Sequence, residues 1–149
     1  MIQRKQTLFL AASVVLFLST FAFPFGTIGT FELHNYKVIA ADGSAVEGIS
    51  TYYFSIPMAI ASIVSAFAIF LYSNRQRQMA AVRISFIFYA ASFALMSLYI
   101  MQAVNVLATE SFEFGISFFL PFAAFFSNMI ALRGIRKDEQ LVKSLDRLR

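Results

Sequence analysis

The chain alternates between long apolar runs and short polar segments. Four uncharged runs cover about residues 7–25, 52–72, 84–108 and 114–132. Each is close to the roughly 20 residues that a helix needs to cross the hydrocarbon core of a bilayer. Because these runs lack charge on every helical face, they do not fit amphipathic helices of a soluble core. The pattern predicts an all-α membrane protein, a bundle of four transmembrane helices forming a single domain over residues 1–149.

The first run admits a second interpretation. A basic head followed by an apolar segment also describes a secretory signal peptide, and small residues around Thr20–Ala22 would permit cleavage. The run is longer than the usual apolar region of about 7–15 residues in such peptides, which favours an uncleaved first span.

The polar segments set the predicted orientation. The short segment 73–83 carries Arg75, Arg77 and Arg83, and basic residues in short loops are retained in the cytoplasm. The tail, residues 133–149, is also basic, whereas Lys37 is the single Lys or Arg in the segment 26–51. We therefore expect a cytoplasmic loop at 73–83, a cytoplasmic tail, an outer loop at 26–51, and both termini in the cytoplasm.

The outer loop changes from a helical to a strand-like pattern. Residues 30–34 and 36–39 alternate β-branched and aromatic residues with polar ones, and Asp42-Gly43 is a turn signal. A two-stranded hairpin is marginal alone in water, so we expect a small β-hairpin that rests on the helix ends. The isolated His34 is expected to be a surface side chain rather than a metal ligand.

Small residues recur at helical spacing in two of the predicted spans. Such stripes let neighbouring helices approach closely in a membrane. We therefore expect helix packing along two sets, Ser55, Ala59, Ser62 and Ala66 in the second span and Ala123, Ser127 and Ala131 in the fourth.

Three amides lie inside the predicted spans. Gln102 and Asn105 are three residues apart and share a face near the outer end of the third span. Because an amide in lipid is costly unless bonded, we expect both to face another helix or the outer cap, with Ser19 and Thr20 at the same depth. Asn128 lies deeper, level with Ala66 and Ala94 when residues are counted from the outer side.

The tail has the pattern of a basic amphipathic helix on the inner membrane surface. Glu139 and Lys143 form a favourable pair four residues apart. The apolar face contains Leu141, Val142, Leu145 and Leu148, and the basic face contains Arg136, Lys143 and Arg147. Anchoring to lipid headgroups and docking of a cytoplasmic partner both remain open.

Composition narrows the chemistry. Apolar residues make up 59% of the 149 residues and charged residues only 13%, against about 25% in soluble proteins. The absence of Cys excludes disulfides and Cys-based metal sites. The net charge is +4, and the basic residues responsible for it flank the predicted spans. Anionic membrane lipid is therefore a better candidate for their binding partner than nucleic acid.

The predicted spans offer little for catalysis. They contain no Asp, Glu, His, Lys, Arg or Cys, so we predict no catalytic residue, cofactor or metal site and no enzyme activity. Coupled transporters also commonly carry an intramembrane carboxylate. We expect a non-catalytic accessory or scaffold subunit that contacts lipids and other membrane proteins. The alternative is an oligomeric pore or a transporter of small molecules or lipids.

Three segments resemble one known family. They are Met1-Ile2-Gln3-Arg4, the turn Asn74-Arg75-x-x-Gln78, and the end from Ala131-Leu132-Arg133-Gly134-Ile135-Arg136 to Leu148-Arg149. The full chain resembles uncharacterised four-span membrane proteins of Bacteroidetes bacteria, a family known only as a domain of unknown function. The resemblance implies a bacterial inner membrane and four helices, and it supplies no catalytic residues.

Overall fold

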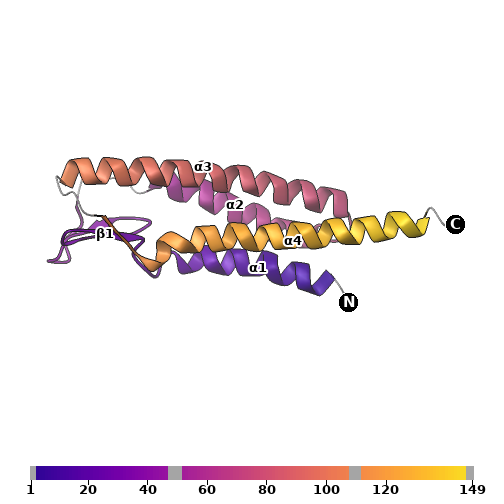
Figure 1. Cartoon of the computed structure of the whole chain (residues 1–149). Coiled ribbons are helices and arrows are strands. Elements are labelled where there is room, and N and C mark those ends of the chain that lie inside the picture. The colour runs from indigo at the N-terminus through magenta and orange to yellow at the C-terminus, as the bar shows by residue number, and fades with distance from the viewer. Residues whose placement is uncertain (1–2, 47–51, 108–111, 147–149) are drawn as a thin grey trace.

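The computed structural model describes residues 3–46, 52–107 and 112–146, and it is mostly helical (Figure 1). The helices are α1 (Gln3–Ser19), α2 (Tyr52–Phe70), α3 (Arg75–Leu107) and α4 (Ile116–Asp146). The strands are β1 (Gly26–Ile28), β2 (Phe31–Leu33), β3 (Val38–Ile39) and β4 (Phe112–Phe114).

The four helices lie side by side along a common axis, with the short strands gathered at one end (Figure 1). Helix α2 packs mainly on α3, and α1 packs mainly on α4. Within the described residues, α2, α3 and α4 are long and apolar enough to cross a membrane, and the apolar part of α1, Lys5–Ser19, is shorter. The fold therefore has three helices compatible with membrane spans, plus a fourth helix of lesser length.

Helix α1 ends earlier than the apolar run in the sequence. Its last residue is Ser19, whereas the run extends to about residue 25. Residues 20–22 form tight turns, and the Thr20 hydroxyl donates to the Phe17 carbonyl at 2.7 Å. Because the residue before a proline avoids the helical region, Pro24 prevents the chain from continuing as a helix.

Helix α3 begins within the basic segment. Its first residue is Arg75, so most of the segment 73–83 that we expected to be a loop forms the first turns of α3. The Asn74 side chain caps this end, since its Oδ1 accepts from the Arg77 amide at 3.1 Å. Gln, Arg, Met and Ala are good helix formers, so the helix continues where the apolar pattern stops.

Helix α4 also extends past its apolar run. It continues without a break to Asp146, so the expected separate amphipathic helix on the membrane surface is instead the end of α4. Gly134 does not interrupt the helix. A Cβ at this glycine would lie 3.0 Å from Cγ of Gln6, so the glycine permits a close approach of α1 to α4.

The strands form one antiparallel sheet in the order β3-β2-β1-β4. Leu33 pairs with Val38, which confirms a hairpin within the segment 26–51, and Asp42-Gly43 forms a turn that brings Ile39 opposite Ala45. Gly43 adopts a φ of 80°, which glycine tolerates without a steric cost. Strands β1 and β4 were not expected, and β4 comes from the segment between α3 and α4.

The buried core has three tiers along the bundle. The tier at the sheet end of the bundle, which we call the outer end by position only, joins the sheet to the last turns of α3 through Phe25, Ile28, Leu33, Tyr99 and Ala103. A middle tier includes Phe17, Met58, Tyr89 and Ala124, and an inner tier includes Leu10, Val82, Ala131 and Ile135. The outer third of α3 thus packs on the sheet, beyond the point where α2 begins.

Candidate functional site

The centre of the bundle contains a buried amide. The Asn128 side chain is fully buried, and its Nδ2 donates to Ser65 Oγ at 2.7 Å and to Ser85 Oγ at 3.2 Å. These bonds join α4 to α2 and α3. We expected Asn128 to lie at the depth of Ala66, which agrees with its contact at the adjacent Ser65. We also expected Asn128 to lie at the depth of Ala94 on α3, which is wrong, since its contact on α3 is Ser85. The depth was misjudged because α3 extends much farther toward the sheet end than the other helices.

Further hydroxyl groups surround Asn128. Ser13, Ser62 and Tyr89 are buried, and the Tyr89 hydroxyl faces the hydroxyls of Ser13, Ser62 and Ser65. In the described part of the chain, Tyr89 OH, Ser62 Oγ and Asn128 Oδ1 have no direct hydrogen-bond partner. Polar side chains from all four helices therefore meet in the middle of an apolar bundle.

The expected packing stripes are only partly buried. Ser55, Ser62, Ser127 and Ala131 are buried, Ala59 and Ala66 are half-buried, and Ala123 is exposed. The prediction of a contact at Ala123 is therefore wrong. On α2 the contact face is centred one residue earlier than expected, on the set Phe54, Met58, Ala61, Ser65 and Ala68. The spacing of small residues predicted the contact face of α2 only approximately. The interface also contains larger side chains, such as Phe54 and Met58, and its centre is shifted toward them.

Several hydroxyls bond to the backbone of a neighbouring helix. Ser127 Oγ donates to the Phe9 carbonyl at 2.7 Å, and Ser92 Oγ donates to the Phe54 carbonyl at 2.8 Å. The first bond holds α4 on α1, and the second holds α3 on α2. The second bond also places the start of α2 level with Ser92.

A polar junction at the outer end was missed by the sequence analysis. Asn35 is buried and donates to Thr20 Oγ1, while its carbonyl accepts from Ser55 Oγ at 2.7 Å. Ser117 Oγ donates to the Thr20 carbonyl at 2.9 Å. The junction ties the loop of the sheet to the ends of α1, α2 and α4. Its signal in the sequence was a Ser or Thr near the end of each of these helices.

Gln102 and Asn105 do not face the bundle. Both side chains are exposed on α3, so the expected contacts with Ser19 and Thr20 are wrong. The error came from counting depth from the outer ends of the apolar runs. The outer third of α3, which includes Gln102 and Asn105, extends beyond the ends of the other helices. The side of α3 that faces the bundle axis packs there against the sheet.

The exposed amides lie within a larger apolar face. Leu98, Met101 and Val106 are 61%, 63% and 60% exposed, and helical spacing places them on the same side of α3 as Gln102 and Asn105. We call these five residues the outer α3 face.

His34 is more buried than expected. It is only 9% exposed, and its Nε2 lies 3.3 Å from Glu32 Oε2. The expectation of a surface side chain was therefore wrong: His34 lies in the turn between β2 and β3, where the centroid of its ring is 5.7 Å from that of Tyr36. Over residues 3–46, 52–107 and 112–146, no three His, Asp or Glu side chains gather as metal ligands would.

The inner end of the bundle is polar. Gln6 Nε2 donates to Asp138 Oδ2, and Arg75 Nη1 donates to the Asp138 carbonyl at 3.3 Å. Of the expected basic face, Arg136 and Lys143 are exposed, and Arg147 lies outside the described residues. The apolar face at Leu141, Val142 and Leu145 is exposed as well, and Leu148 is not among the described residues.

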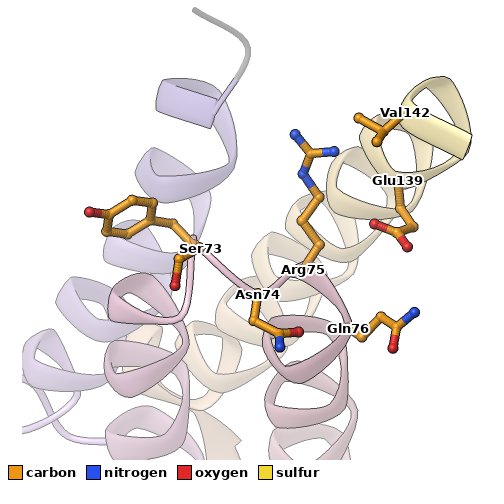
Figure 2. A pocket seen from close by; sticks show the side chains of 7 residues that line it. Ser73, Asn74, Arg75, Gln76, Glu139 and Val142 are labelled. Atoms are coloured by element: carbon orange, nitrogen blue, oxygen red, sulfur yellow. The ribbon is translucent and has the colours of Figure 1, made fainter. Parts of the chain in front are cut away.

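A groove of about 520 Å³ opens at this inner end (Figure 2). Residues 72–76, from the connection after α2 to the first turn of α3, form one side, and Glu139 and Val142 of α4 form the other. Figure 2 shows the Arg75 side chain extending between these two sides.

The architecture defines a helical protein with three apolar helices of membrane-spanning length and a small sheet at one end. A family model described as a domain of unknown function, DUF4293, matches residues 2–148. The chain belongs to this family. No curated protein matches the sequence.

Proposed function

We propose that the chain is an integral protein of the bacterial inner membrane that acts as a non-catalytic accessory or scaffold subunit. In this proposal α1–α4 all cross the membrane, with both termini in the cytoplasm and the sheet outside. The distribution of charge supports this orientation, because Arg75, Arg77, Arg133 and Arg136 lie at the end of the bundle opposite the sheet.

One observation carries the proposal: the outer α3 face exposes both amide and large apolar side chains. Ser92 is level with the first turn of α2, so residues 93–107 continue roughly 22 Å farther out at about 1.5 Å per residue. In lipid, the exposed amides of Gln102 and Asn105 would lack partners. In water, Leu98, Met101 and Val106 would expose a contiguous apolar surface. A protein partner satisfies both requirements.

The partner that fits this face is a helix of another membrane protein. Leu98, Met101 and Asn105 repeat at three- to four-residue spacing, which matches the contact stripe of one helix against another. The two amides can donate to and accept from a polar side chain or a carbonyl of the partner helix.

The test is purification of the full chain at native abundance after mild extraction, followed by mass spectrometry. We expect a partner in stoichiometric amount. The double variant Gln102→Leu/Asn105→Leu should lose that partner while the chain still inserts, since both side chains are exposed. A matched control is Ile63→Ala on the exposed side of α2, which should keep the partner. A chain that purifies alone, or a partner retained by the double variant, would contradict the proposal.

A further inference from the structure

The groove at the inner end offers a cationic group on the side of residues 72–76. Arg75 is half-buried, and its bond to the Asp138 carbonyl uses one of the five N–H donors of a guanidinium. This bond fixes the side chain at the mouth of the groove. The planar guanidinium matches the oxygens of a phosphate better than an ammonium does. Ser73, Asn74 and Gln76 add polar side chains to the same side.

The opposite side of the groove carries an anionic group. The Glu139 side chain is 17% exposed, and its Oε1 lies 3.3 Å from Nζ of Lys143, whose side chain is 60% exposed. A carboxylate has a second oxygen that can accept another donor. A groove that bound only a phosphate would be weakened by this carboxylate through like-charge repulsion. The lining therefore favours a ligand that has both a negative and a positive group.

The position of the groove indicates where such a ligand comes from. The groove lies where α2 ends and α3 begins, which is the level of the inner headgroups if the helices span the membrane as proposed above. Tyr72 lines it and is exposed, as interfacial aromatic residues are. Val142 supplies an apolar contact beside the two charged groups.

We propose that this groove binds the phosphoethanolamine headgroup of a membrane phospholipid. Arg75 holds the phosphate, and Glu139 accepts hydrogen bonds from the primary ammonium. This assignment rests on the membrane placement in the proposed function, and it adds a specific lipid to it. A trimethylated headgroup has no N–H group, so phosphatidylcholine cannot donate hydrogen bonds to Glu139.

The test uses the full chain in nanodiscs of phosphatidylcholine doped with phosphatidylethanolamine or with phosphatidylglycerol, and measures the lipid retained after transfer to detergent. We expect phosphatidylethanolamine to be retained in preference to both other lipids. Arg75→Gln should weaken retention at least about tenfold, since a hydrogen bond to a charged group is lost. Glu139→Ala, which removes the acceptor, should abolish the preference for phosphatidylethanolamine over phosphatidylcholine.

The matched control is Arg136→Gln, which removes an exposed charge of α4 outside the groove and should leave retention unchanged. Equal retention of all three lipids, or a preference that survives Glu139→Ala, would overturn the assignment. Soluble phosphoethanolamine that competes as well as the lipid would show a soluble ligand and overturn the lipid source. The purification experiment tests protein binding at the outer α3 face, whereas lipid retention tests the groove. A failure of one proposal can therefore be distinguished from a failure of the other.

Discussion

Asn128 of α4 donates through Nδ2 to Ser65 Oγ of α2 at 2.7 Å, in the middle of a bundle whose other contacts are mostly apolar. The same nitrogen reaches Ser85 of α3. One amide therefore fixes the rotation and depth of three helices relative to one another. If the bundle lies in a membrane as we propose, apolar packing alone specifies the rotation and depth of the helices weakly, because lipid is as apolar as the helix faces.

Replacing this amide should destabilise the bundle. Asn128→Leu keeps a similar volume but removes both interhelical hydrogen bonds and leaves two buried serines without this donor. We expect a loss of about 1 kcal/mol in the free energy of unfolding, the scale measured for such bonds in membrane proteins. Denaturant titration in mixed micelles checks this value. The control is Asn105→Leu, whose side chain is exposed and which should leave the monomer's stability unchanged; equal effects of the two variants would contradict the role of Asn128.

Gly115 should not accept a side chain. Its amide donates to the Phe25 carbonyl at 3.0 Å, and a Cβ at this position would collide with the Pro24 carbonyl oxygen and lie 3.0 Å from the Phe25 carbonyl carbon. These neighbours are backbone atoms and cannot rotate away. We expect Gly115→Ala to cost about 1–3 kcal/mol, the usual scale of overpacking.

The comparison for Gly115 is Gly43→Ala. At Gly43 no atom lies within 4 Å of the added Cβ, but the φ of +80° imposes a backbone cost of about 1 kcal/mol. Thermal unfolding in detergent measures both variants. A melting temperature of Gly115→Ala at or above that of Gly43→Ala would disprove the close approach.

The turn at residues 40–44 should weaken in acid. Hydrogen bonds from the Ser44 hydroxyl and the Ser44 amide lower the pKa of Asp42 below its usual value of 3.8. A lowered pKa means that the contribution is complete above the ordinary pKa and is lost as pH falls through the pKa of the folded state. The protection factor of the Ser44 amide, the exchange rate of the unfolded chain divided by the observed rate at the same pH, should therefore fall in that acidic range. In Asp42→Asn, which keeps an acceptor without titrating, this pH dependence of the protection factor should disappear; its persistence would assign the effect to another group.

The sequence predicted the helical class and the hairpin because both depend on local patterns. Uncharged runs located α2 within two residues, and Asp42-Gly43 marked the turn between Ile39 and Ala45. The extensions of α3 to Arg75 and of α4 to Asp146 were missed because the uncharged runs stop at basic residues, whereas the helices continue through them. Strand β4 was missed because the three residues from Phe112 become a strand only through pairing with β1.

Among the polar residues, too, some positions could be predicted from the sequence and others could not. Asn128 could be recognised as an amide that needs a partner, and its level with Ala66 was close to the actual contact at Ser65. Gln102 and Asn105 followed the same rule, yet they face outward, because the sheet occupies the inner side of α3 at their level. The sheet's position depends on the junction of Asn35 with Thr20, Ser55 and Ser117, which joins residues far apart in the chain and has no local pattern.

The most direct test of the scaffold proposal is site-specific photo-crosslinking in intact cells. A photoreactive phenylalanine analogue at Met101 samples the outer α3 face, and the same analogue at Ile63 samples the exposed side of α2. We predict a discrete protein adduct from position 101 and only lipid adducts from position 63. Lipid adducts alone from both positions would show that the outer α3 face contacts no protein, and would contradict the proposal.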